Sequence, residues 1–259
     1  MLQPFIIGHR GAAAVAPENT LVSFARAFAD GADGVEFDVQ LSGDGVPVVI
    51  HDDTPKRTAL PPPGNIRWAR IAAFTAAELT RIDVGSRFNL LYPALAHESF
   101  ASATIPTLEQ VFDACPRGLL YVELKCEPNE GAELARVVAK MVRERGLVER
   151  VIIESFAHDA IAEAKRHAPE IRAAALFDVS WRNLIAPAEK IIAAAQAVHA
   201  DEIAPYTLLT TKRLVQLARQ HNLPTVIWTA DAPAWAARAR RYGIHAIITN
   251  NPARMRAAL

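Results

Sequence analysis

Charged residues alternate with apolar ones in two short runs of the sequence, VEFDV and YVELK. Neighbouring side chains of a strand point to opposite faces, so Glu36 and Asp38 share one face of the first run. By the same rule, Glu123 and Lys125 share one face of the second. Three carboxylates gathered at one place would form an all-oxygen site that suits Mg²⁺ or Ca²⁺ better than Zn²⁺. An inward salt bridge of Lys125 with one or two of the acids is the alternative interpretation.

Two histidines are candidates for proton transfer at the same site. His9 follows a short apolar run and is itself followed by Arg10. A histidine at the end of a strand can act as a general acid or base at neutral pH. An arginine can bind a phosphate through two N–H groups.

The second histidine, His51, is placed by a hairpin. Only Leu41-Ser42-Gly43-Asp44-Gly45 separates the run that ends at Gln40 from the run that begins at Val46. A gap of this length is too short for a parallel crossover and typical of an antiparallel turn. If Leu41 faces Val46, His51 lies opposite Glu36, with Cβ atoms about 4.5–5.5 Å apart. We therefore expect His51 beside the acids.

The elements that position these residues alternate between strand and helix patterns over the chain. Two segments, 21–28 and 134–141, have apolar residues at helical spacing, and Asn250-Asn251-Pro252 is a plausible start for the last helix. The strand candidates are Phe5–Gly8, Val35–Gln40, Val46–His51, Leu119–Lys125, Val151–Ser155, Ile171–Phe177, Asp201–Ala204, Thr225–Thr229 and Ala246–Thr249. Without the hairpin strand Val46–His51, eight remain, which predicts a (β/α)8 TIM barrel rather than an open doubly wound sheet. Active sites of such barrels lie at the carboxyl ends of the strands.

The bulk properties agree with one α/β domain over residues 1–259, with an inserted loop or small subdomain at about 53–105. The formal net charge is zero, which offers no argument for a nucleic-acid partner. Two cysteines do not suggest a disulfide framework. We see no secretory signal and no apolar stretch that could span a bilayer, so we expect a cytoplasmic protein without stable membrane insertion. The oligomeric state stays open.

The ordered motifs of the chain resemble those of the glycerophosphodiester phosphodiesterases. The motifs are GHRG at 8–11, PENT at 17–20, EFDV at 36–39, HD at 51–52, IPTLE at 105–109 and ELK at 123–125, with weaker matches at 155–156, 228–229 and 247–249. The resemblance covers nearly the whole chain, and its N-terminal half is highly specific. It implies a TIM barrel with an insertion after the His-Asp pair, which is where the long connection falls here.

The resemblance also implies roles for individual residues. His9 and His51 would form the acid–base pair, and Glu36, Asp38 and Glu123 would bind a divalent metal, Mg²⁺ or Ca²⁺. The phosphate of a small glycerophosphodiester would contact Arg10 and Lys125, and the products would be glycerol 3-phosphate and an alcohol. Phe156 and Trp228 are candidates for lining the alcohol pocket, although buried aromatic residues are often only core.

Three positions in the C-terminal half depart from the family pattern. Members often carry aspartate at the position of Asn250, asparagine at that of Asp231 and glycine at that of Ala246. We expect these differences to alter the alcohol pocket or its rim without abolishing turnover.

Two other functions remain as alternatives. A lysophospholipase D acting on membrane lipids could shelter an acyl chain against the apolar segment Phe88–Tyr92. A non-catalytic barrel that binds a phosphodiester would need no acid–base pair, so the intact histidines and acids argue against it.

Overall fold

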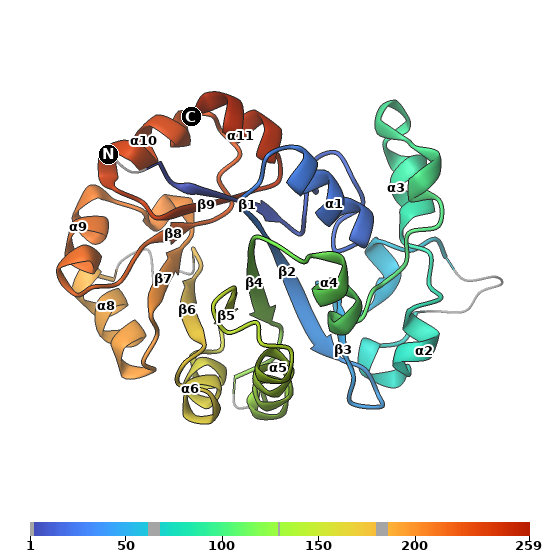
Figure 1. The fold of residues 1–259 in the computed structure, drawn as a ribbon, viewed down its shortest axis with the longest axis horizontal. Coiled ribbons are helices and arrows are strands. Elements are labelled where there is room, and N and C mark those ends of the chain that lie inside the picture. The colour runs from blue at the N-terminus through green and yellow to red at the C-terminus, as the bar shows by residue number, and fades with distance from the viewer. Residues whose placement is uncertain (1–2, 62–67, 129, 180–185) are drawn as a thin grey trace.

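The computed structural model describes residues 3–61, 68–128, 130–179 and 186–259. Within them the chain forms a nearly closed barrel of eight parallel strands with helices between them (Figure 1). The barrel strands are β1 Phe5–His9, β2 Gly34–Leu41, β4 Leu119–Leu124, β5 Val151–Ser155, β6 Arg172–Phe177, β7 Glu202–Pro205, β8 Val226–Ile227 and β9 Ala246–Thr249. The predicted barrel is therefore confirmed.

The order of the barrel strands in the sheet is β7-β6-β5-β4-β2-β1-β9-β8. Two isolated parallel bridges, Ile203↔Thr225 and Tyr206↔Trp228, bring the β7 and β8 ends of this order together. In the described residues, the seam between β7 and β8 is therefore held by isolated bridges rather than by a continuous ladder.

Strand β3 (Pro47–Val49) pairs antiparallel with β2, as a hairpin requires. Its register differs by one residue from our prediction, because Leu41 pairs with Pro47 and Val39 with Val49. The turn has three residues at its tip, with Gly45 in the left-handed region at φ 77°, and Ser42 N donates to Val46 O at 3.0 Å. A loop of three residues between paired strands shifts the pairing by one residue from the Leu41–Val46 pairing that we predicted. His51 thus lies beyond the end of β3 and is not paired with Glu36.

Helices cover the outside of the barrel. They are α1 Leu21–Ala29, α4 Leu108–Ala114, α5 Ala132–Glu144, α6 His158–His167, α8 Ala188–Ala197, α9 Lys212–Gln220, α10 Ala234–Tyr242 and α11 Pro252–Ala258. The two segments with helical apolar spacing form α1 and α5, and α11 begins with Asn251 as its cap and Pro252 in its first turn.

The strand faces divide as their alternation predicts. Val35, Phe37 and Val39 are fully buried in the main apolar cluster, which also contains residues of the covering helices. A smaller cluster, with Ile7 and Tyr121 among its members, fills the inside of the barrel. The polar residues of β2 and β4 share that inner side.

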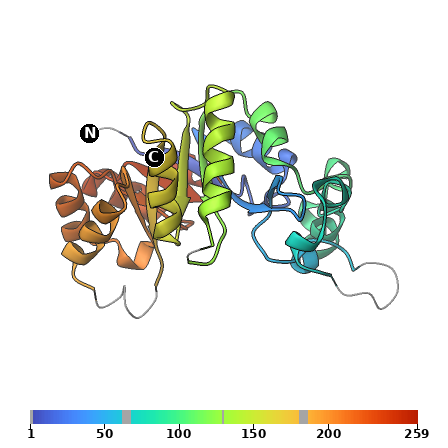
Figure 2. The ribbon, with the colours of Figure 1, turned by 90° about the horizontal axis from the view of Figure 1, so that it is seen from below.

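The connection from β3 to α4 carries short helical elements at the side of the barrel, at the right in Figures 1 and 2. They are η1 Pro55–Arg57, η2 Ile71–Ala73, α2 Ala76–Leu79, α3 Gly85–Leu91, η3 Pro93–Leu95 and η4 Glu98–Phe100. These elements fall within the stretch at about 53–105 where we predicted an inserted loop or small subdomain, and residues 62–67 of that stretch lie outside the described residues. Among the described residues, no helix has the length and apolar character needed to cross a membrane.

Candidate active site

A tight turn after β1 presents His9 and Arg10. Arg10 and Gly11 both have positive φ, 50° and 85°, and a Cβ on Gly11 would lie 2.4 Å from Ser23 Oγ. Only glycine fits so close to α1 in that conformation. The Arg10 backbone N–H donates to Glu36 Oε2 at 3.0 Å, which fixes the turn against β2.

Glu36, Asp38 and Glu123 meet on the inner side of the barrel. Their ligand atoms all lie within 4.8 Å of one another, and each residue is less than 9 % exposed. Sheet register explains the meeting, because Asp38 and Glu123 are direct partners across β2 and β4. The three acids could together hold a metal ion.

Burial and mutual repulsion act strongly on these carboxyls. Burial, with the charges of Asp38 and Glu123, raises the pKa of Glu36 well above its usual value. Burial and Asp38 raise the pKa of Glu123 to about 8, although Lys125 opposes the change. Burial would also raise the pKa of Asp38, but Arg10 and Lys125 outweigh it and hold that pKa below its usual range. The protein alone therefore does not favour three ionised acids here.

The donor set fits a hard divalent cation. Asp38 Oδ1 is buried and receives no hydrogen bond from any described residue, and its nearby cation, Lys125 Nζ, is 3.6 Å away. Lys125 Nζ lies closer to Glu123 Oε1, at 2.9 Å, so the predicted salt bridge exists as well. Two basic side chains, Arg10 and Lys125, do not neutralise all the acids, and carboxylate oxygens are the ligands that Mg²⁺ and Ca²⁺ prefer.

His9 is held from the opposite side by Asn250. His9 Nδ1 and Asn250 Oδ1 are 2.7 Å apart, and His9 Nε2 lies 3.8 Å from Glu36 Oε2. Burial and the neighbouring Arg10 lower the pKa of His9 to about 4, so the imidazole is neutral at pH 7. We expected Asn250 to alter the alcohol pocket or its rim; its side chain contacts His9, and an effect on the pocket stays a prediction.

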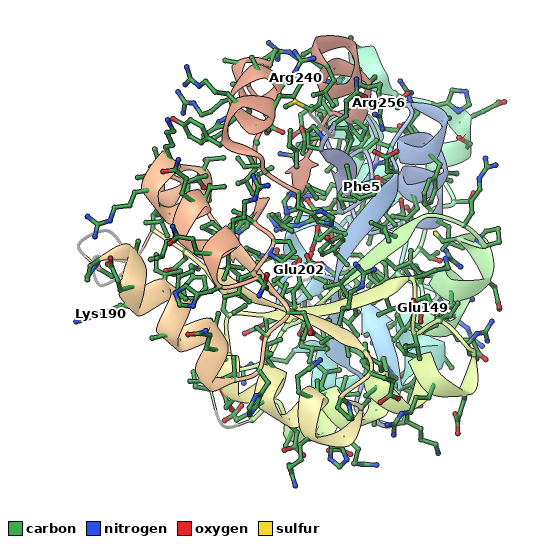
Figure 3. The ribbon with its side chains drawn as sticks, turned by 60° about the vertical axis from the view of Figure 1, so that its left-hand side comes forward. Phe5, Glu149, Lys190, Glu202, Arg240 and Arg256 are labelled. Atoms are coloured by element: carbon green, nitrogen blue, oxygen red, sulfur yellow. The ribbon has the colours of Figure 1, made fainter. Side chains whose placement is uncertain are left out.

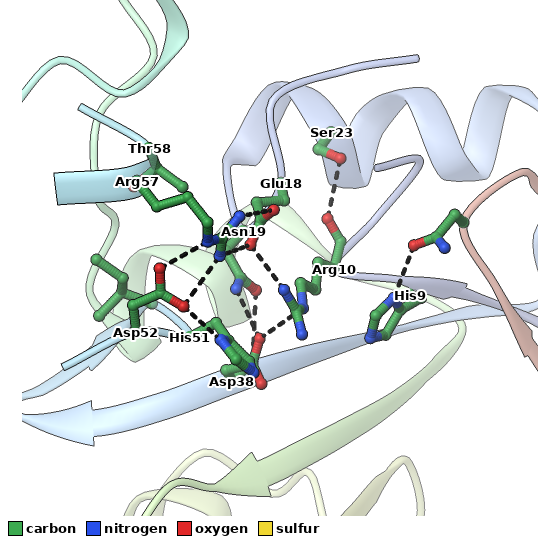
Figure 4. Close-up of polar contacts among 12 residues, drawn as sticks. His9, Arg10, Glu18, Asn19, Ser23, Asp38, His51, Asp52, Arg57 and Thr58 are labelled. Atoms are coloured by element: carbon green, nitrogen blue, oxygen red, sulfur yellow. Dashed lines mark hydrogen bonds and ion pairs between the residues drawn. The ribbon is translucent and has the colours of Figure 1, made fainter. Parts of the chain in front are cut away.

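His51 belongs to a chain of charged contacts that Figure 4 shows. His51 Nδ1 lies 2.6 Å from Asp52 Oδ1, and Arg57 bonds to both Asp52 and Glu18. Glu18 in turn accepts a hydrogen bond from Arg10 at 2.9 Å. The insertion residue Arg57 therefore connects the surroundings of the two predicted catalytic histidines.

The guanidinium of Arg10 is engaged on two sides. Its Nη1 donates to Glu18, and its Nε lies 3.1 Å from Asp38 Oδ2. A guanidinium has five N–H donors, so Nη2 and the second N–H of Nη1 are not taken up by these acids, and a two-point contact of Arg10 with phosphate stays a prediction.

One small cavity of about 60 Å³ joins most of the predicted site residues. Its lining includes His9, Arg10, Glu36, His51, Glu123, Lys125, Glu154, Phe156 and Trp228. An outer cavity of about 460 Å³ shares His51, Glu123, Lys125 and Phe156 with it. The Phe156 and Trp228 rings pack edge to face at 5.3 Å between centroids.

Our reasoning from sequence missed Glu154, a fourth buried acid of this cavity. It is 1 % exposed, it pairs with Glu123 across β4 and β5, and its Oε2 finds no hydrogen-bond partner in the described part of the chain. Burial and the neighbouring acids raise its pKa well above the usual value. The signal was available, since Glu154 is a lone carboxylate in the otherwise apolar run VIIES.

Comparisons with known proteins agree with this geometry. Residues 9–254 match the glycerophosphoryl diester phosphodiesterase family. A glycerophosphodiester phosphodiesterase from Caldanaerobacter subterraneus subsp. tengcongensis is 31 % identical over 97 % of this chain and 96 % of its own length.

Two solved structures carry the same fold. An Oleispira antarctica phosphodiesterase in complex with the product sn-glycerol-3-phosphate has a TM-score of 0.80 at 26 % identity, covering 99 % of this chain and 96 % of that one. A glycerophosphodiester phosphodiesterase from Agrobacterium tumefaciens str. C58 has a TM-score of 0.78 at 25 % identity, covering 98 % and 99 %. This chain therefore belongs to the glycerophosphoryl diester phosphodiesterase family and is an enzyme that hydrolyses phosphodiesters.

Proposed function

We propose that the enzyme hydrolyses glycerophosphodiesters to glycerol 3-phosphate and an alcohol, with a divalent cation, Mg²⁺ or Ca²⁺, at Glu36, Asp38 and Glu123. The observation that carries the proposal is the single cavity that His9, His51, Arg10 and Lys125 line together with two of these acids. The product bound to the Oleispira antarctica relative supports the same substrate class.

The basic and the aromatic side chains of the cavity would have separate roles. Arg10 and Lys125 place positive charge where the phosphate oxygens gain negative charge in the transition state. A bound cation would add to that stabilisation. Phe156 and Trp228 form an aromatic wall beside Lys125 and would pack against the organic part of the substrate.

The two histidines would carry the protons. His9 is neutral at pH 7, so it suits the acceptor that takes a proton from the attacking hydroxyl. If that hydroxyl belongs to water, glycerol 3-phosphate forms directly. If it belongs to the substrate's glycerol, a cyclic phosphate forms as the alcohol leaves, and water then opens it to glycerol 3-phosphate. His51 would then protonate the oxygen of the leaving alcohol as its bond to phosphorus breaks. His51 lines both cavities, and the outer one offers room for that alcohol.

A cytoplasmic location stays a prediction from the sequence.

A panel of substrates tests the proposal. The purified enzyme is expected to release glycerol 3-phosphate from glycerophosphocholine, glycerophosphoethanolamine or glycerophosphoglycerol. Excess chelator should stop release, and Mg²⁺ or Ca²⁺ should restore it. Full activity in excess chelator would remove the metal from the proposal, and no release from any diester would remove the substrate class.

A lysophospholipase D activity is the second candidate, because α3 exposes a group of apolar side chains. Leu90, Leu91 and Tyr92 are 68 %, 55 % and 51 % exposed. Lysophosphatidylcholine in the same panel separates the two functions. If it is the better substrate, replacing Leu90 and Leu91 by serine should reduce its turnover and leave that of glycerophosphocholine unchanged.

A further inference from the structure

Behind His9, hydrogen bonds connect three side chains from neighbouring strands of the barrel. His9 Nδ1 lies 2.7 Å from Asn250 Oδ1, and Asn250 Nδ2 donates to Asp231 Oδ2 at 2.7 Å. The backbone N–H of Asn250 donates to Asp231 Oδ1 at 2.8 Å, and Thr249 Oγ1 donates to the same oxygen at 3.0 Å. His9 ends β1, Asn250 follows β9 and Asp231 follows β8, and these strands are adjacent in the sheet.

The chemistry of the three groups determines where the imidazole proton lies. An ionised aspartate only accepts hydrogen bonds, so the amide nitrogen of Asn250 must face Asp231. The amide oxygen then faces His9, and an oxygen acceptor requires a proton on Nδ1. An imidazole with its one proton on Nδ1 has its lone pair on Nε2, the nitrogen that lies 3.8 Å from Glu36 Oε2 at the cavity.

We propose that Asp231 and Asn250 form a positioning pair, in which Asp231 orients the Asn250 amide and the amide holds His9 with its proton on Nδ1. The two positions hold one carboxylate and one amide, and they bond to each other. The two positions therefore act as a unit rather than as two separate departures.

The proposal rests on His9 accepting a proton in the proposed reaction, so its test needs a measurement that does not depend on turnover. The ¹⁵N signals of the imidazole in the resting full-length enzyme show which nitrogen carries the proton, and the His9→Ala variant identifies the His9 signals. We expect the Nδ1–H form in the wild type. In Asp231→Asn both amide orientations become possible, so we expect a mixture of the two tautomers.

Kinetics of the exchanged residues provide the second measurement. Asn250→Asp alone sets two carboxylates against each other, and we expect kcat to fall about 10- to 100-fold with little change in KM, because the imidazole is displaced. The double exchange D231N/N250D restores one carboxylate and one amide, and it should return kcat to within about threefold of the wild type and keep the Nδ1–H form.

The control is Asp201→Asn, which removes the negative charge that faces Lys165 and accepts from the Ala173 N–H at the far end of the barrel. It should lower the melting temperature and leave the His9 tautomer unchanged. Wild-type kcat and a pure Nδ1–H form in both single variants would overturn the pairing, as would folded single variants that the double exchange fails to rescue. A wild type with the Nδ1–H form but no turnover of any diester would support the pair and count against the proposed function.

Discussion

Buried carboxylates lie at two levels inside the barrel. At the mouth, Glu36, Asp38, Glu123 and Glu154 crowd together, and two of their oxygens lack hydrogen-bond partners among the described residues. At the opposite end, Glu202 is 2 % exposed and sits among the strands in Figure 3.

The partners of the acids differ between the levels. The Tyr121 hydroxyl donates to Glu202 Oε2 at 3.0 Å, and Arg172 Nη1 lies 3.5 Å from Oε1. Each oxygen of Glu202 thus has a hydrogen-bond or ion-pair partner within the protein. At the mouth, Asp38 Oδ1 and Glu154 Oε2 have no hydrogen-bond partner among the described residues. A buried carboxylate is therefore not by itself evidence of a functional site. A buried carboxylate oxygen that lacks a hydrogen-bond partner is the stronger indication.

The largest expected effect belongs to the mouth. His9→Ala and His51→Ala should each lower kcat by about 10²- to 10⁴-fold while the melting temperature changes little, because each removes one proton transfer. His158→Ala is the control, since His158 bonds the Leu176 carbonyl and does not line the inner cavity. Near-normal kcat in either site variant would remove that histidine from the acid–base pair.

A matched pair of substitutions then compares the two levels directly. Glu123→Gln should weaken metal affinity by at least the ~10- to 100-fold that the loss of a residue supporting a metal ligand costs. In the wild type, a cation at 100 times its dissociation constant stabilises the fold by about 2.7 kcal/mol, and thermal melting at the same cation concentration should show this gain reduced to about 1.4 kcal/mol or less in the variant. Glu202→Gln should keep the full gain. Equal responses of both variants to the cation would contradict the assignment of Glu123.

The pH dependence of stability is a further test of Glu202. Burial raises the pKa of Glu202 from 4.5 to about 7 in the folded protein. A raised carboxyl pKa means that protonated Glu202 stabilises the fold fully below about pH 4.5 and that this contribution is lost as the pH rises through about 7. Glu202→Gln should therefore gain on the wild type by roughly 3 kcal/mol between pH 4.5 and 7. Parallel melting curves across this range would show that Glu202 titrates normally.

The smallest effect is expected for Tyr121→Phe. The substitution removes the hydroxyl that donates to Glu202, and the loss of such a bond costs about 1 kcal/mol or somewhat more when the acceptor stays buried. Chemical denaturation measures this cost, and kcat should not change. A fall in kcat would mean that the two levels are coupled.

Strand alternation was sufficient to predict the three acids and Lys125 as neighbours. Residues two apart share a face whatever the tertiary structure, and a barrel has only one inside. The predicted hairpin register was wrong by one residue. The spacing of the residues does not reveal the conformation of the turn, in which Gly45 lies in the left-handed region.

Contacts that involve side chains outside the strands were beyond sequence reasoning. Asn250 lies 241 residues from its partner His9, and Arg57 lies 39 residues from Glu18. No local period connects such pairs, because they meet only after the barrel closes. Glu154 was different, since the alternation that revealed Asp38 applied equally to its strand.

The seam between β7 and β8 has a consequence for how the enzyme opens. In the described residues, two isolated bridges rather than a continuous ladder pair those strands, while β1, β2 and β4 lie in the interior of the sheet order, away from both of its ends. Amide hydrogens along the seam should exchange with deuterium sooner than those of β2, because local opening begins where pairing is sparse. The barrel can then open locally between β7 and β8 while the strands that carry the acids and His9 keep their alignment.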